Sequence, residues 1–114
     1  MKINFDFVIR DFGGIAYKEG QGDLKAFEII PSVLVSPHFK EGDFYEKFSL
    51  ADKIFKEKEI EISDKEYSLI TSAVRRRAIQ IIPDNELANQ NIPVIMGYIL
   101  KELNNLKKSK NDNT

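Results

Sequence analysis

Three stretches of this chain repeat apolar residues at every third or fourth position, and this helical spacing limits the possible folds more than any other feature. The first stretch covers residues 43–58. Asp43 is a residue type that caps helix N-termini, and Glu46 stands three positions later, as in a capping box. The apolar stripe consists of Phe44, Phe48, Ala51, Ile54 and Phe55. We expect its phenylalanines to share one core with apolar residues from the start of the chain.

The other two stretches have their own boundary signals. Ser63 followed by Glu66 is a capping box, and Pro83 is expected to stop the helix that it opens. The apolar stripe of this second helix is Tyr67, Ile70, Ala73, Val74, Ala78 and Ile81. A third helix is predicted from an Asn91 cap, with Pro93 near its start. Its seam consists of Ile92, Ile95, Ile99, Leu103 and Leu106.

The N-terminal part shows the patterns of strands and turns. Residues 3–9 alternate, with Ile3, Phe5, Phe7 and Ile9 on one face, as in a half-buried strand. Two glycines within residues 11–14 predict a tight turn, so residues 15–17 are expected to return as an antiparallel strand. Residues 18–23 are predicted as a loop. Residues 24–36 are ambiguous, and we expect an extended segment followed by a helical turn with Pro31 in its first turn.

These patterns predict an α+β fold that is mostly helical, with a small N-terminal β-hairpin packed on three main helices. Residues 59–62 alternate and predict a short extended link between the first two of these helices. A chain of 114 residues with 42% apolar residues matches one globular domain, which we expect over residues 1–106. Residues 107–114 are polar and are expected to form a disordered tail.

Composition excludes several classes of protein. The 17 basic and 18 acidic residues give a net charge of −1, which argues against nucleic acid as a partner. The chain has no cysteine, which excludes disulfides, cysteine metal sites and thiol nucleophiles. Small secreted domains usually carry disulfides, so a cytoplasmic location is expected. No apolar run approaches the length of a membrane span.

No residue pattern predicts catalysis, a cofactor or a metal site. His38 is the only histidine, and no catalytic arrangement of serine or carboxylate residues accompanies it. The tripeptide at residues 11–13 matches a metal-binding motif of protein kinases, but the other kinase motifs are missing, so a turn is the better interpretation. Glu59 and Glu61 lack the spacing of a calcium loop. We therefore predict a protein that is not an enzyme.

The run Arg75, Arg76 and Arg77 is the one concentrated charge in the sequence. Successive helix positions point about 100° apart, so the three side chains cannot form one flat patch. Arg77 falls within the apolar stripe, where we expect its stem to pack on apolar side chains and its head to meet a carboxylate or helix-end carbonyls, unless the helix breaks there. Arg75 and Arg76 fall in solvent and are candidates for contact with a partner. The structural alternative is stabilisation of the helix C-terminus.

Leu103 and Leu106 complete the set of candidate partner-binding residues. They lie at the end of a seam that is long for a domain with a modest core. We expect this end of the helix to extend past the domain and to pair with a second copy of the chain or with another protein.

The helical segments resemble a pattern in short proteins encoded by tailed phages and prophages. In those proteins a helix with a Leu-Ala-x-Lys-Ile core, here residues 50–54, leads through an acidic link into a capped helix, here beginning at Ser63. A segment with a glycine turn precedes them, as residues 11–17 do here. The resemblance covers residues 8–75. It implies no catalytic residues and no cofactor.

The resemblance implies a non-enzymatic phage or prophage accessory protein that binds another protein, as an assembly or tail-region factor. A small inhibitor of a host enzyme or defence complex is an alternative with the same structural needs. A nucleic-acid-binding regulator that uses Arg75, Arg76 and Arg77 is a second alternative. The implied location is the cytoplasm of the host cell, with the virion as the alternative.

Overall fold

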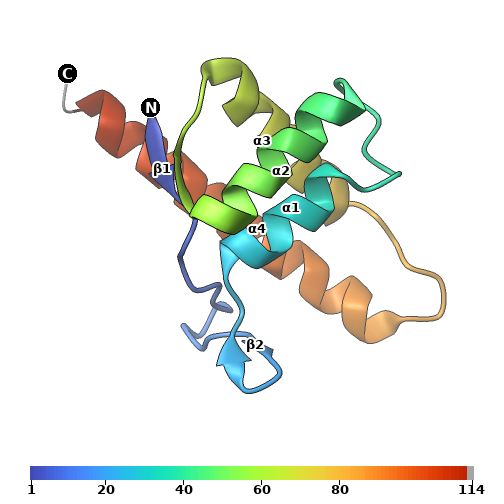
Figure 1. Ribbon diagram of the computed structural model, residues 1–114. Coiled ribbons are helices and arrows are strands. Elements are labelled where there is room, and N and C mark those ends of the chain that lie inside the picture. Colours follow the sequence, from blue (N-terminus) through green and yellow to red (C-terminus); the bar gives the residue numbers. More distant parts are fainter. Residues whose placement is uncertain (113–114) are drawn as a thin grey trace.

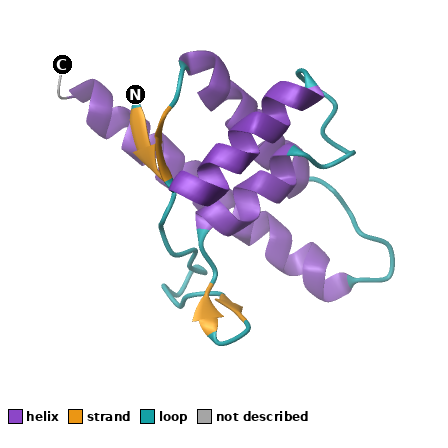
Figure 2. Ribbon diagram, viewed as in Figure 1, coloured by secondary structure: helices purple, strands orange, loops and turns teal. Residues whose placement is uncertain are grey.

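One hydrophobic core runs through the chain, from Ile3 near the N-terminus to Leu103 in the last helix. The computed structural model describes residues 1–112, with side chains as far as residue 109. Within this range, four helices form the body of the molecule, and two short strand pairs lie at separate edges (Figures 1 and 2). The helices are α1 (Ala26–Leu34), α2 (Phe44–Glu57), α3 (Asp64–Ala78) and α4 (Glu86–Asp112). The predicted α+β, mostly helical class is therefore confirmed.

The first strand pairs with a distant segment of the chain. Strand β1 (Lys2–Asn4) lies antiparallel to β4 (Glu59–Glu61), which connects α2 to α3. The register sets Ile3 opposite Ile60, and both side chains are buried. The alternating segment at residues 3–9 is therefore not one strand, because only its start belongs to β1, whereas its end forms the predicted antiparallel pairing with residues 15–17. In β4 the alternating Glu-Ile-Glu pattern places one buried isoleucine, Ile60, opposite Ile3. The two residues are far apart in the chain, so a local sequence pattern does not predict that they pair.

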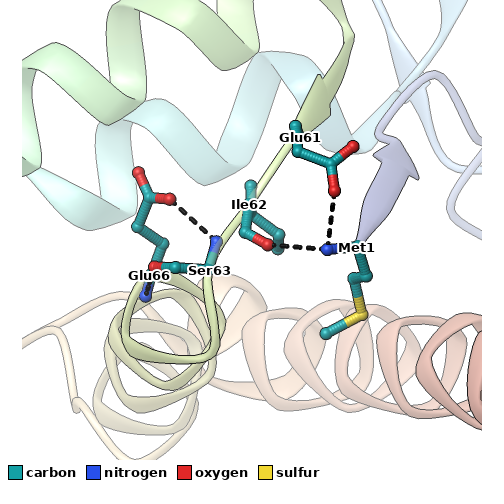
Figure 3. Close-up of polar contacts among 5 residues, drawn as sticks. All are labelled: Met1, Glu61, Ile62, Ser63 and Glu66. Atoms are coloured by element: carbon teal, nitrogen blue, oxygen red, sulfur yellow. Dashed lines mark hydrogen bonds and ion pairs between the residues drawn. The ribbon is translucent and has the colours of Figure 1, made fainter.

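The Met1 backbone holds β1 against the start of α3 (Figure 3). Its terminal ammonium donates a hydrogen bond to the Ile62 carbonyl at 3.0 Å and pairs with the Glu61 carboxylate at 2.9 Å. The Ile62 amide in turn donates to the Met1 carbonyl at 2.8 Å. Ser63, which caps α3, comes directly after this pairing. The strand pair and the helix start are thus fixed together.

The predicted turn at residues 11–14 is present, and a short antiparallel pairing of the residues on its two sides follows it. The Asp11 carboxylate accepts hydrogen bonds from the amides of Gly13 and Ile15, and Gly14 adopts a positive φ of 81°. Residues 15–17 return antiparallel to residues 9–11 through a bridge between Ala16 and Arg10. The Tyr17 amide donates to the Ile9 carbonyl at 2.9 Å, and the Asp11 amide donates to the Ile15 carbonyl at 2.9 Å. Residues 18–23, which the sequence predicts as a loop, contain the small hairpin of β2 (Lys18–Glu19) and β3 (Gly22–Asp23).

Pro31 lies inside α1 and not in its first turn, so that prediction is wrong. A proline within a helix has no amide to donate to the carbonyl four residues earlier, which is that of Phe27. The helix is only nine residues long, and its inward side chains are Ala26, Ile30, Val33 and Leu34. Burial of these side chains in the core stabilises the helix despite the missing hydrogen bond.

The capping box of α3 is confirmed. The Glu66 amide donates to the Ser63 hydroxyl at 3.1 Å, and the Ser63 amide donates to the Glu66 carboxylate at 2.9 Å (Figure 3). The helix ends at Ala78, well before Pro83, because the chain turns there and the Gln80 amide bonds to the Arg77 carbonyl. Ile81 is therefore exposed and does not belong to the buried stripe.

Helix α4 is longer at both ends than the sequence predicts. It starts at Glu86, and the side chain of Asn85, rather than Asn91, accepts a hydrogen bond from the Ala88 amide. Its last described residue is Asp112, so the part of the expected disordered tail at 107–112 is helical, and residues 113–114 lie outside the described range. Twenty-seven residues span about 40 Å, close to the 44 Å length of the molecule. No helix within residues 1–112 is long and apolar enough to cross a membrane.

Replacing Ser63 with alanine should lower the free energy of unfolding by about 1 kcal/mol, because the amides of the first turn lose their cap. Urea denaturation monitored by circular dichroism measures this as a lower midpoint with an unchanged slope. Ser68→Ala is the matched control, since this exposed serine lies in the same helix beyond its cap. Equal midpoints for wild type and Ser63→Ala would show that the capping box adds nothing to stability.

Candidate functional site

Helix α2 turns a lysine toward the core and three phenylalanines away from it. Lys47 is only 4% exposed, whereas Phe44, Phe48 and Phe55 are between 54 and 61% exposed. The prediction that these phenylalanines belong to the core is wrong. The buried side chains of α2 are instead Lys47, Leu50, Ala51 and Ile54.

The width of the apolar surface of α2 explains this orientation. At 100° per residue, its apolar side chains cover an arc of about 160°, which is wider than the stripe that packs on the core. Leu50, Ile54 and Ala51 occupy one side of the arc, and this side is buried. Phe44, Phe55 and Phe48 occupy the other side. Lys47 falls between Ile54 and Ala51, so burial of these two residues places the lysine inside as well.

The loop between α1 and α2 satisfies the buried ammonium group. Lys47 Nζ donates a hydrogen bond to the Phe39 carbonyl at 2.8 Å and lies 4.8 Å from the centre of the Phe39 ring. Gly42 adopts a positive φ of 78°, and a Cβ atom there would lie 2.9 Å from Leu69 Cδ1. The loop thus passes closely over α2 and α3 at a position that suits glycine. A buried ammonium without such partners would be costly.

The three exposed phenylalanines lie on one side of α2 and form two ring pairs, one of them with Phe27 of α1. The rings of Phe44 and Phe48 have centroids 6.4 Å apart, and Phe55 lies 6.1 Å from Phe27 of α1. Lys58 Nζ lies 4.6 Å from the centre of the Phe27 ring. The two helices lie side by side in Figure 1. We name Phe27, Phe44, Phe48 and Phe55 the aromatic face.

A groove of about 360 Å³ lies on the other side of α2, between this helix and α3. Leu50 and Leu69 provide its apolar lining, and Tyr45 stands exposed at its edge. Lys65 and Glu46 form an ion pair of 3.6 Å across the two helices. The exposed ridge of α2 is therefore flanked by the aromatic face on one side and by this groove on the other.

The three arginines diverge, as their spacing predicts. Arg76 is exposed, and its Nε donates to the His38 carbonyl at 3.3 Å. Arg77 is half-buried, and its guanidinium meets the Gln80 amide oxygen at 2.8 Å rather than a carboxylate or a helix-end carbonyl. The helix continues one residue past Arg77. Arg75 is exposed on a different side, where it lines a groove between α3 and α4.

The two leucines of the predicted partner-binding set belong to the interior of this chain. Leu103 is fully buried next to the core position of Ile99, one turn earlier in α4, and Leu106 is partly buried against the same core. The prediction that Leu103 extends past the domain is wrong, because its side chain is fully buried in the core of this chain. Leu103 is thus not available to a second copy.

Comparison with protein-family models, curated proteins and solved structures gave no match for this chain. Within the described residues, no group of three or more histidine, cysteine or acidic side chains is arranged to hold a metal ion. The aromatic face is the candidate binding surface of the described residues, because it exposes three large apolar rings on one helix. The sequence pattern does not predict it, since the same rings are expected in the core. The sequence signal that could have revealed it is the apolar arc of α2, which is wider than the stripe that a helix needs to pack on a core.

Replacing Phe48 with alanine should lower the free energy of unfolding by less than about 1 kcal/mol, because the ring is half-exposed. Ile54→Ala, on the buried side of the same helix, should cost about 2–5 kcal/mol through the loss of packing and the cavity that remains. Chemical denaturation of the two variants beside wild type measures both values. The opposite order of the two costs would mean that α2 packs with its phenylalanines inside.

Proposed function

We propose that this protein is a non-enzymatic accessory protein, of the kind encoded by tailed phages and prophages, that acts by binding another protein through its aromatic face. The observation that supports this most is the row of half-exposed phenylalanines on α2. Contiguous apolar patches on the surface of a soluble domain commonly mark interaction sites, and phenylalanine is enriched at protein interfaces.

The aromatic face is already ordered in the free protein. Asp43 caps the start of α2 through a 3.0 Å hydrogen bond from the Glu46 amide, and the Lys58 amide closes its end on the Ile54 carbonyl at 3.0 Å. Leu50 and Ile54 fix the helix to the core. A partner that covers the phenylalanines therefore gains apolar contact without the entropic cost of ordering the helix.

The occupant that fits the aromatic face is an apolar segment of another protein. The flanking charges of α2 are balanced, since Lys56 pairs with Asp52 at 3.1 Å, so apolar contact rather than net charge would provide the affinity. In an assembly or tail-region factor the partner is a phage structural protein, and in an inhibitor it is a host enzyme or a component of a defence complex. Both versions use the same surface.

The divergence of the arginines argues against the nucleic-acid-binding alternative. Arg76 and Arg77 bond to His38 and Gln80 of their own chain, and Arg75 lies on another side of α3. Nucleic-acid modules present basic side chains along one face or stripe, where each neutralises a phosphate. These three residues do not form such a stripe.

The double variant Phe44→Ser/Phe48→Ser should lose the partner while the protein stays folded, with a melting temperature lowered by only a few degrees. The measurement is affinity purification of the tagged full chain from phage-infected or lysogenic cells, followed by mass spectrometry. The matched control is Ile79→Ser/Ile81→Ser, which also removes two exposed apolar side chains, but from the α3–α4 connection. This control should retain the partner.

The identity of the captured protein distinguishes the versions of the proposal. A phage structural protein lost only in the α2 variant supports an assembly role, and a host enzyme or defence component lost in the same way supports inhibition. A partner retained by both variants, or lost equally by both, would contradict binding through the aromatic face.

A further inference from the structure

The groove between α3 and α4 gathers hydrogen-bond donors and positive charge. It has a volume of about 330 Å³. Its polar lining comes from Tyr67, Ser68, Thr71 and Arg75 of α3 and from Asn104 and Lys107 of α4. No aspartate or glutamate is among the lining residues.

Tyr67 presents an unpartnered hydroxyl to this groove. Its side chain is largely buried, yet no hydrogen bond to the hydroxyl is found within the described residues. No buried side-chain nitrogen or oxygen in the described range lacks a hydrogen-bond partner, so the Tyr67 hydroxyl must reach solvent, and the groove is where Tyr67 lines the surface. Burial raises the pKa of this hydroxyl, against an opposing effect from the charge of Arg75, so it stays protonated as a donor.

Two cations line the groove beside Tyr67, and neither has a carboxylate partner among the described side chains. Lys107 Nζ lies 4.6 Å from the centre of the Tyr67 ring, and Arg75 is exposed beside it. Neither cation forms an ion pair with any described side chain. Among the described lysines and arginines, ion pairs with acidic side chains are formed by Lys18, Lys25, Lys56 and Lys65, so the groove is distinguished by the convergence of two unpaired cations and not by the missing partners alone. The positive charge in the groove is thus not neutralised by an ion pair with any of the side chains that the structure describes.

We propose that the groove between α3 and α4 binds a phosphate group, supplied by inorganic phosphate or by a small phosphate monoester. A phosphate monoester carries a charge of about −1.5 to −2 at neutral pH, which the two cations balance. The Arg75 guanidinium offers a planar fork that matches phosphate oxygens, and Lys107 offers a point charge. The Tyr67 hydroxyl and the Asn104 amide add neutral donors.

The groove suits a single phosphate better than a nucleic acid. Nucleic-acid binding at cellular salt commonly uses about 6–10 phosphate contacts spread along the backbone. Here two cations converge on one hollow, and the neighbouring Arg76 and Arg77 bond elsewhere within the chain. A compact ligand with one phosphate therefore matches the charge and the shape of the site. This binding site is separate from the aromatic face and does not depend on the function proposed for that face.

Titration of the isotope-labelled full chain, followed by amide NMR spectra, tests this site. The probes are inorganic phosphate and glycerol 3-phosphate, with sodium chloride at equal ionic strength as the reference. Both phosphates should cause saturable shifts at Tyr67, Arg75 and Asn104, and chloride should not. Tighter binding of glycerol 3-phosphate would identify a monoester as the ligand class, and equal affinity would identify the free anion.

Three variants make the test specific. Arg75→Gln should weaken phosphate binding about tenfold or more, because it removes a charge-assisted donor. Tyr67→Phe keeps the buried ring and should weaken binding severalfold without lowering the melting temperature. Arg76→Gln is the control with the same loss of charge one residue away, and it should bind like wild type.

Two results would overturn this site. Equal weakening by Arg75→Gln and Arg76→Gln, or shifts that never saturate, would show general screening of surface charge. Saturable binding of a short DNA duplex that shifts Arg75, Arg76 and Arg77 together, without binding of either small phosphate, would assign these residues to nucleic acid instead.

Discussion

The orientation of α2, with Leu50, Ala51 and Ile54 packed on the core and Lys47 buried among them, is the constraint on which the aromatic face depends. With the Lys47 ammonium held 2.8 Å from the Phe39 carbonyl, α2 is oriented with Ile54 and Leu50 inside. The same orientation leaves Phe44 and Phe48 on the outside of the helix. The reverse orientation would bury the phenylalanine rings and expose the Lys47 ammonium to solvent. The hydrophobic effect alone would favour this reverse orientation. The tight loop over Lys47, with Gly42 close to Leu69, provides the partners that make the observed orientation possible.

The two proposed binding surfaces lie on different parts of one small domain. The aromatic face offers apolar contact on α2, and the groove between α3 and α4 offers positive charge and hydroxyl donors. The core beneath both surfaces is continuous and is closed by the pairing of Ile3 with Ile60. Because the helices that carry the two surfaces pack on this core, each surface keeps its shape in the free protein. Such rigid surfaces suit a protein that acts by binding.

The sequence predicts the features that depend on neighbouring residues and misses those that depend on distant ones. The capping box of Ser63 and Glu66 and the turn at Asp11 are local, and both predictions are confirmed. The partner of β1 lies 55 or more residues away in the chain, and no local pattern identifies it. The orientation of α2 was missed because its apolar arc is wider than the buried stripe, and the position of Lys47 within the arc was the available signal. Arg75 was singled out correctly as exposed, but its neighbours Tyr67 and Lys107 come together only through the packing of α3 on α4.

Lysine labelling of the native protein tests the orientation of α2 most directly. An amine-reactive reagent is applied for increasing times, and mass spectrometry of peptides measures the modification of Lys47 and of Lys53 on the same helix. Lys53 is exposed, so Lys47 should react at least about tenfold more slowly and reach the same rate only in denaturant. Equal rates in the native protein would place Lys47 in solvent, and the aromatic face would then have to lie in the core.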